Sequence, residues 1–289
     1  MPSVPASVLR LLVQCPDRPG IVAAVSQYLF AHGANIMQAD QFSTADGAGR
    51  FFLRVEFQTE ALDVTQEDLE ARFAAEIADR FEMDWRLSGA RRKRAALLAS
   101  RTDHCLLDLL WRWRRGELDM DIPLVISNHD NLSEDVATFG IPYHYLPVEK
   151  GKRPEQEAAI RALLVEHDVD LVVLARYMQI LSGEFIAEYP NRIINIHHSF
   201  LPAFAGADPY GQAFERGVKI IGATAHYATR ELDQGPIIEQ DVARVSHRDS
   251  VDDLIRKGRD LEKIVLARAV DLHLRNRVLV YGNKTVVFD

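Results

Sequence analysis

Two polar residues one step apart on a predicted strand are the first candidates for chemistry. Asn195 and His197 lie at the end of an apolar run that begins at Ile193. Side chains alternate between the faces of a strand, so both residues project to the same side. Open α/β sheets bind ligands at the carboxyl ends of their strands. There an amide can hold a developing oxyanion and an imidazole can move a proton, which is the requirement of acyl transfer.

A second motif downstream makes this interpretation more specific. The string NIHHSFLP at 195–202 is followed by GATAHY at 222–227 and LDQGPII at 232–238. Together these strings resemble the signatures of the folate-dependent formyltransferases. The resemblance implies that Asn195 holds the oxyanion, that His197 transfers a proton, and that Asp233 orients the imidazole and accepts a proton from the nucleophile.

Each of these residues also has a structural interpretation. Alone, Asn195 could cap the following loop and Asp233 could form a turn before the Gly-Pro pair; the joint pattern favours catalysis. His198 points away from His197 on a strand, so packing or support is expected of it. A zinc site built on these histidines and His226 is not expected, because adjacent strand residues diverge and no carboxylate or cysteine has ligand spacing. A structural or orienting role is expected for His226.

The resemblance also places the folate. Residues 176–181 (RYMQIL) occupy the position of the family's folate loop. Substrate binding is therefore expected from five residues: Met178, Gln179, Ile180, Leu181 and Gly206. Without the resemblance, the apolar members of this group would be assigned to the core at a strand–helix junction.

Composition limits the remaining classes. The chain has 289 residues, 47% of them hydrophobic, with two cysteines and a formal net charge of −8. This length suggests about two domains. No apolar run approaches the roughly 18 residues of a membrane span, and no secretory leader is recognisable. The two distant cysteines favour a reducing cytoplasm over a disulfide or zinc framework. The acidic charge gives no support to nucleic-acid binding.

The first part of the chain predicts a ferredoxin-like βαββαβ unit. Strands are expected at 8–14, 36–44, 50–57 and 81–87, and helices from 21 to Gly33 and at 67–80. The strings DRPGIV at 17–22 and GANI at 33–36 resemble an ACT domain, a regulatory module that binds amino acids, usually across a dimer interface. The resemblance places Asp17, Gly20 and Asn35 near an effector pocket. Ligand binding and simple oligomerisation remain equally open, because a fold does not establish a ligand.

The rest of the chain predicts a doubly wound, mostly parallel α/β domain. We expect an ACT-like domain over 1–87, a basic linker over 88–94 and a formyltransferase-like catalytic domain over 95–289. The pattern predicts strands at 95–100, 122–127, 171–175, 193–197 and 219–227, helices at 103–115, 132–139, 153–166, 182–189 and 251–275, and a terminal hairpin at 278–281 and 284–288.

The acceptor of the formyl group is inferred from the positions at which this chain differs from other members of the formyltransferase family. Members of the family that act on glycinamide ribonucleotide carry a Gly/Ser-rich phosphate loop where this chain has SRTDHC at 100–105, a poor phosphate cradle. No basic C-terminal domain for tRNA is evident. With an ACT module in front, the whole resembles the formyltetrahydrofolate deformylase family. That implies hydrolysis of 10-formyltetrahydrofolate, with no cofactor, and formate for purine synthesis.

Three further expectations follow from this resemblance. An amino acid linked to one-carbon metabolism, such as glycine or methionine, would regulate the ACT domain. The chain would form a dimer or tetramer, and would bind neither nucleic acid nor membrane. Two alternatives remain: a formyltransferase with another small amine acceptor, and a non-catalytic folate or amino-acid sensor.

Overall fold

Two compact units make up the chain. The computed structural model describes residues 8–45, 49–89, 91–149, 151–202 and 209–288. The second unit contains 92–274 and 282–285, and the first contains the rest of the chain. The terminal segments 275–281 and 286–289 therefore group with the first unit, although no sequence pattern separates them from the second domain.

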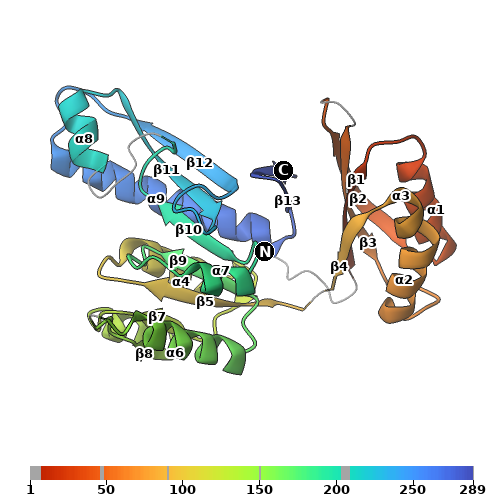
Figure 1. Cartoon of the computed structure of the whole chain (residues 1–289), viewed down its shortest axis with the longest axis horizontal. Helices are drawn as coiled ribbons and strands as arrows, with labels where there is room; N and C mark the ends of the chain where they lie inside the picture. The colour runs from red at the N-terminus through yellow and green to blue at the C-terminus, as the bar shows by residue number, and fades with distance from the viewer. Residues whose placement is uncertain (1–7, 46–48, 90, 150, 203–208, 289) are drawn as a thin grey trace. The chain divides into compact units, whose positions relative to one another are not determined.

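The first unit is a four-stranded antiparallel sheet with its helices on one face (Figure 1). The strand order is β2-β3-β1-β4. Its elements before the linker are β1 (Val8–Pro16), α1 (Ile21–Ala31), β2 (Asn35–Ser43), β3 (Arg50–Gln58), α2 (Gln66–Phe73), the π-helical turn Ala74–Ala78, α3 (Asp79–Phe81) and β4 (Asp84–Ser88). The expected βαββαβ order is thus observed.

The two faces of this sheet are covered differently. Leu11 and Val13 of β1 face the helices, where they join the main core of the unit. The alternate residue Leu12 faces the other side, with Phe52 of β3. That side is covered by the terminal hairpin β13 (Val278–Tyr281) and β14 (Lys284–Val287), through Leu279, Val286 and Phe288.

A buried arginine joins the sheet to the segment just before this hairpin. Arg54 of β3 is 1% exposed. Its guanidinium donates to Glu56 at 2.6 Å and to the main-chain oxygens of Arg275 and Asn276 at 3.3 and 3.2 Å. A charge this deeply buried requires such partners. The residues that follow the last long helix therefore complete the polar interior of the first unit.

The second unit is built on a mixed sheet of order β12-β11-β10-β9-β5-β7-β8. The strands β10, β9, β5, β7 and β8 are parallel to one another. Strands β11 and β12 are antiparallel additions at one edge. The strands are β5 (Lys93–Ala99), β6 (Met120–Asp121, beside β5), β7 (Val125–Ser127), β8 (Tyr143–Tyr145), β9 (Leu171–Ala175), β10 (Ile193–His197), β11 (Ile220–Tyr227) and β12 (Ile237–Arg244). The sequence did not predict β12, whose polar residues alternate along an exposed edge.

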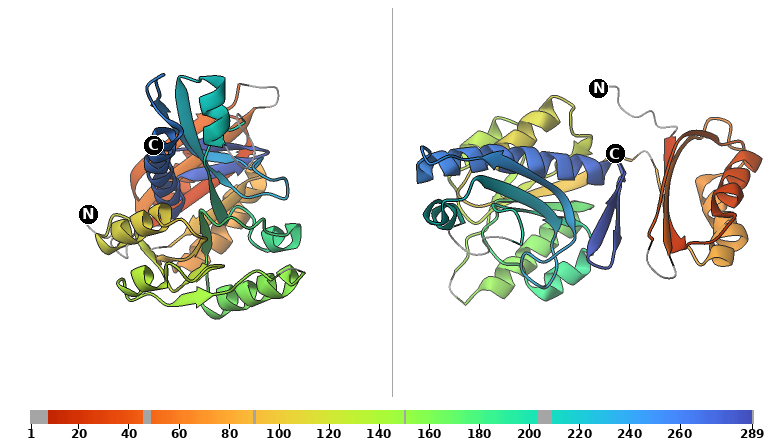
Figure 2. Two further views of the ribbon diagram at one scale, coloured as in Figure 1. Left: turned by 90° about the vertical axis from the view of Figure 1, so that its left-hand side faces the viewer. Right: turned by 90° about the horizontal axis from the view of Figure 1, so that it is seen from above.

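Helices cover this sheet, and one of them bears on the site. The 24-residue helix α9 (Val251–Leu274) packs on β10, β11 and β12 and against α4 (Figures 1 and 2). The helices before it are α4 (His104–Arg114), α5 (Ser133–Ala137), α6 (Arg153–Glu166), α7 (Gly183–Glu188) and α8 (Pro209–Arg216). The short α8 was not predicted. Among the described residues, no helix is both long and apolar enough to cross a bilayer.

Candidate active site

Strand β10 presents the first two candidates at its carboxyl end. Ile194 and Ile196 are buried and fix the strand in the sheet. Asn195 and His197 therefore share the opposite face, as predicted from their spacing. In the antiparallel pairing with β11, Asn195 lies directly opposite His226. Three polar side chains are thus brought to one patch of the sheet.

The third candidate arrives on a tight loop after β11. Asp233 has a φ of 57°, in the left-handed region that Asp tolerates better than most residues. The loop turns back at Gly235, where an added Cβ would lie 1.7 Å from the main-chain oxygen of Tyr227. The amide of Tyr227 in turn donates to the oxygen of Pro236 at 2.9 Å. Only glycine permits this close approach, which brings Asp233 back to the end of β11.

These side chains converge. His197 Nδ1 lies 3.3 Å from Asp233 Oδ2, and His226 Nε2 lies 3.7 Å from Asp233 Oδ1. Asn195 Nδ2 lies 3.2 Å from His226 Nε2. His197 Nε2 is buried and has no hydrogen-bond partner among the described residues. The ring of His197 is therefore held at one nitrogen by a carboxylate, while its other nitrogen remains available for a substrate.

The hydrogen bonds of His226 assign it a positioning role. Its Nδ1 lies 3.0 Å from the main-chain oxygen of Tyr227, which can only accept, so Nδ1 carries a proton. In the neutral ring, Nε2 is then an acceptor and receives the amide hydrogen of Asn195. This fixes the orientation of the Asn195 side chain and leaves its second amide hydrogen without a hydrogen-bond partner in the described part of the chain.

The carboxylate at the centre of the group is ionised. The hydrogen bond from His197 lowers the pKa of Asp233 well below its usual range, although burial acts in the opposite direction. An ionised Asp233 accepts from His197 Nδ1 and stabilises positive charge on that ring. The group is therefore suited to take a proton at His197 Nε2 and return it.

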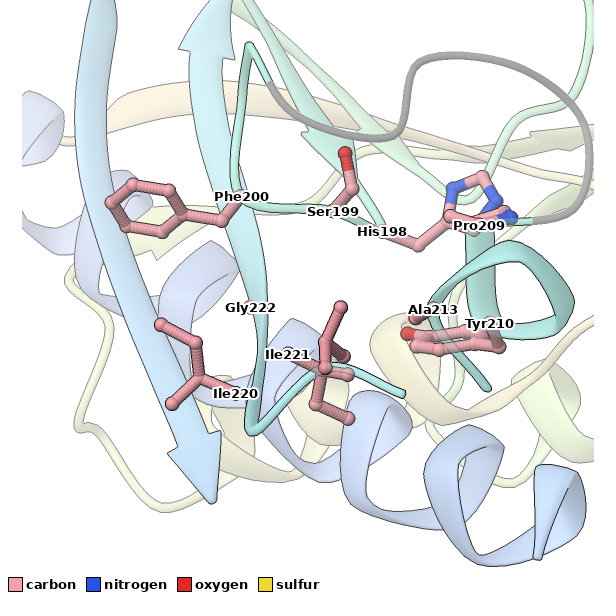
Figure 3. Close-up of a pocket in the computed structure, with 10 residues that line it drawn as sticks. His198, Ser199, Phe200, Pro209, Tyr210, Ala213, Ile220, Ile221 and Gly222 are labelled. Carbon is pink, nitrogen blue, oxygen red and sulfur yellow. The ribbon is translucent and has the colours of Figure 1, made fainter. Parts of the chain in front are cut away.

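An apolar cavity of about 240 Å³ lies beside this group (Figure 3). It is lined by His198 to Phe200, by α8 residues that include Tyr210, and by Val218 and residues 220–222. The ring of His198 lies 5.1 Å from that of His197 and 6.0 Å from that of Tyr210. Burial, with the positive charge of Arg176, lowers the pKa of His198 to about 4, so this imidazole is neutral near pH 7.

The predicted folate loop is held by hydrogen bonds to neighbouring segments, and it exposes two apolar side chains to solvent. Met178 and Ile180 are 58% and 57% exposed. The amide of Met178 donates to Ser100 Oγ at 2.9 Å, and the amide of Ser182 donates to the buried carboxylate of Glu157 at 2.8 Å. Exposed apolar side chains on a clamped loop are typical of a binding surface for a flat apolar ligand.

Three other predicted substrate contacts are placed differently. Leu181 is 7% exposed and packs in the core with Phe185, so it is buried where its neighbours Met178 and Ile180 are exposed; its place on the wall of a folate slot stays a prediction. The chain passes from loop to α7 at this point, and an apolar side chain anchors that transition. Gln179 is half-buried between its exposed neighbours. Gly206 lies outside the described residues.

A buried polar cluster that the sequence analysis missed adjoins the site. Glu262 of α9, 1% exposed, accepts from Tyr210 Oη at 2.7 Å and contacts His104 Nε2 at 2.8 Å. Arg176 Nε lies 3.4 Å from the same carboxylate. Burial alone would raise the pKa of Glu262, but His104, Arg176 and Tyr210 together lower it. We refer to Arg176, Glu262, His104 and Tyr210 as the Glu262 cluster.

The described residues hold one group of side chains at metal-like spacing, and it belongs to this cluster. It consists of His104, Cys105 and Glu262, whose ligand atoms lie within 4.8 Å of one another. The guanidinium of Arg176 already supplies positive charge there. The three histidines weighed for zinc form no such group among the described residues.

Comparisons with known proteins place the chain in a family. Residues 93–270 match the formyl transferase family, and residues 9–74 match the ACT domain. A formyltetrahydrofolate deformylase from Synechocystis is 56% identical over 96% of this chain and 97% of its own length. The crystal structure of a deformylase of the same description from Pseudomonas syringae has a TM-score of 0.94 at 53% identity, and covers 98% of this chain and 94% of that one. The chain belongs to the formyltetrahydrofolate deformylase family.

A more distant structure marks what is specific to the deformylase family. Glycinamide ribonucleotide transformylase 1 from Symbiobacterium toebii has a TM-score of 0.66 at 33% identity. It covers 68% of this chain but 95% of its own. The transformylase fold thus corresponds to one part of the chain, whereas the deformylases match nearly all of it.

Within one chain, the three predicted effector residues lie at two ends of the ACT-domain sheet. Asp17 and Gly20 form the turn between β1 and α1, next to the end of β1 that pairs with Arg50. Asn35 opens β2 opposite Gln58, at the other end of β3, and donates to the Gln58 side chain at 2.9 Å. One copy of the chain therefore does not gather all three at a single pocket.

The sequence carried a signal for the missed cluster. Gly258, Glu262, Val265 and Ala269 follow one another at helical spacing and are all buried on α9. A glutamate within an otherwise apolar stripe indicates a buried carboxylate that needs partners. Its partners, from segments 52 to 158 residues away, have no spacing that could identify them.

Proposed function

We propose that the chain hydrolyses 10-formyltetrahydrofolate to formate and tetrahydrofolate. One observation carries the proposal: His197 is held by Asp233 at Nδ1, and its Nε2 has no hydrogen-bond partner among the described residues, beside the oriented amide of Asn195. The exposed apolar loop with Met178 and Ile180 supports a flat folate ring nearby. The near full-length similarity to proteins named formyltetrahydrofolate deformylase supports water as the acceptor.

The geometry supports the following course of reaction. Water attacks the formyl carbon while His197 Nε2 takes one of its protons, and Asp233 stabilises the imidazolium that forms. The carbonyl oxygen becomes an oxyanion, to which the second amide hydrogen of Asn195 donates. When the tetrahedral intermediate collapses, the bond from carbon to N10 breaks. Its electron pair stays on the nitrogen, which takes the proton from His197. Formic acid and tetrahydrofolate are left, and the acid gives its proton to water to become formate.

A direct assay tests this function. Purified full-length chain given 10-formyltetrahydrofolate and no amine is expected to release formate and tetrahydrofolate in equal amounts. His197→Ala is expected to lower turnover by roughly two orders of magnitude or more and to leave folate binding nearly unchanged. His247→Ala removes an exposed histidine and serves as the matched control.

The outcomes separate the alternatives. Product that forms only when a small amine is added would favour a formyltransferase. Folate binding without turnover would favour a sensor. Because water and folate complete the reaction above, we also propose that it needs no cofactor or metal. Loss of activity on treatment with a chelator, restored by a metal ion, would contradict that part.

We further propose that an amino acid such as glycine or methionine binds the ACT domain between two copies of the chain. Asp17 and Gly20 lie at the opposite end of the sheet from Asn35, so a pocket that uses all three draws them from different copies. Strand β2 is at the edge of its sheet, and Met37 and Phe42 on it are 54% and 48% exposed. An apolar edge of this kind supports pairing with a second copy.

Titration with each amino acid tests this regulation. Formate release and thermal stability are expected to change with the effector in the native chain and not in Asn35→Ala. Sedimentation is expected to give a dimer or tetramer. The regulation is refuted if neither amino acid changes rate or stability. In the cell, we propose that the chain works in the cytoplasm and that its formate feeds purine synthesis; disruption of its gene is then expected to lower formate-dependent purine labelling.

A further inference from the structure

The Glu262 cluster is placed where an open α/β sheet normally binds a ligand. His104 follows the carboxyl end of β5, Arg176 follows β9, and His198 follows β10. These three strands are parallel neighbours in the sheet. The crevice outside the carboxyl ends of such strands is the usual ligand site of this architecture. Here the protein's own side chains fill part of it.

The cluster is next to the proposed reaction centre. His198 stands between them, because its ring lies 5.1 Å from that of His197 and 6.0 Å from that of Tyr210. In Figure 3, His198 and Tyr210 lie together at one end of the apolar cavity. An acceptor that approached His197 from the β5 and β9 side would meet His104 and Arg176.

The cluster depends on close packing. Tyr210 reaches Glu262 by lying across α9 at Gly258, where an added Cβ would be 1.9 Å from the phenol oxygen. Both carboxylate oxygens of Glu262 are engaged, one by Tyr210 and the other by His104. A buried ion pair contributes little net stability compared with apolar packing of the same volume. Stability alone therefore does not account for this arrangement.

We propose that the Glu262 cluster determines acceptor specificity: it fills the crevice beside His198 that an amine would enter, so that water alone reaches the formyl carbon at His197. This inference rests on the hydrolysis proposed above and names the side chains that exclude amine acceptors. The cluster acts by occupying volume and does not touch the reacting atoms.

An opened crevice would admit a second reaction. The amine nitrogen attacks the formyl carbon and gives a proton to His197 Nε2. The bond from carbon to N10 then breaks, and N10 takes that proton. The products are an N-formyl amine and tetrahydrofolate, without formate. The ratio of N-formyl amine to formate therefore reports access to the formyl carbon, whatever fraction of the enzyme is active.

The test measures this ratio in full-length chain given 10-formyltetrahydrofolate and methoxyamine, which is unprotonated near neutral pH. The double variant His104→Ala/Glu262→Ala removes volume from the cluster. Glu262→Gln keeps the volume and removes the charge. Val136→Ala loosens the buried core at α5, near the other edge of the sheet, and is the control for general softening.

The expected result is a ratio at least about tenfold higher in the double variant, since steric exclusion in a pocket is worth roughly 10- to 200-fold. Glu262→Gln and Val136→Ala are expected to keep the wild-type ratio. If the double variant does not fold, His104→Ala alone, at the more exposed side of the cluster, is read in the same way. An unchanged ratio in the folded variant, or an equal rise in Glu262→Gln, overturns the proposal. Absence of formate from the wild-type chain would instead refute the proposed hydrolysis.

Discussion

Replacement of Asp233 by asparagine is the most informative single perturbation of the site. The substitution keeps the shape of the side chain and removes its charge. Asp233 Oδ2 lies 3.3 Å from His197 Nδ1, a separation at which two unit charges attract by about 1 kcal/mol in bulk water and about 5 kcal/mol at an effective dielectric constant of about 20. That attraction is present only when the ring of His197 is charged, which happens as the proton leaves water.

The loss therefore falls on the chemical step. Because about 1.4 kcal/mol corresponds to tenfold in rate, Asp233→Asn is expected to lower kcat by between about tenfold and a few thousandfold. KM is expected to change little, since the attraction grows as the ring of His197 takes the proton in the chemical step. The assay is initial-rate formate release, with Glu231→Gln as a control that removes an exposed carboxylate from the same loop.

A nearly normal kcat in folded Asp233→Asn would refute this role of the carboxylate. The same conclusion would follow if Glu231→Gln lost as much activity, because the loop's general charge would then be responsible. A large rise in KM with unchanged kcat would make Asp233 a substrate-binding residue.

Three further predictions concern the support of the site. Ser100→Ala removes the acceptor of the Met178 amide. It is expected to raise KM for the folate about two- to tenfold at unchanged kcat, because one hydrogen bond contributes roughly 0.5–1.5 kcal/mol. A normal KM would contradict this prediction. Gly235→Ala forces a contact with the Tyr227 oxygen and is expected to lower the free energy of unfolding by about 1–3 kcal/mol or more in thermal or urea melts. Ionised Asp233, whose folded pKa lies below the unfolded value of about 3.9, stabilises the fold above that pH, so the stability gap between wild type and Asp233→Asn is expected to shrink as the pH falls from about 5 towards that lowered pKa.

The sequence was most informative where chemistry follows local periodicity. The observed bounds of β9, β10 and α6 agree with the predicted ones, because each is a dense apolar or helical pattern with a clear end. The shared face of Asn195 and His197 also follows from strand geometry alone. The family resemblance supplied Asp233, which lies 36 residues beyond His197. Its approach depends on a left-handed turn and a glycine contact that no spacing rule predicts.

Other parts of the site depend on tertiary packing that a linear pattern does not encode. Glu262 is one of several acidic residues on α9, and only the packed helix distinguishes the one that is buried. Leu181 was grouped with exposed neighbours because adjacency in a loop does not determine which side chain turns inward. The ACT resemblance placed the three effector residues near one pocket, and the register of β1 and β2 against β3 puts Asn35 at the opposite end of the sheet from Asp17 and Gly20.

The grouping of the last residues with the N-terminal sheet has a practical consequence for dissecting this protein. A fragment that stops at the linker would expose Leu12 and Phe52 and would deprive the Arg54 guanidinium of two carbonyl acceptors. Removal of the carboxyl-terminal residues would expose the same side chains and remove the same acceptors. If either truncated protein responded differently to an amino acid, the cause would be the exposed face of the sheet and not the loss of a contact to the effector. A fragment meant to isolate the ACT domain should therefore include the residues that follow α9, for instance by circular permutation or by co-expression as a separate peptide.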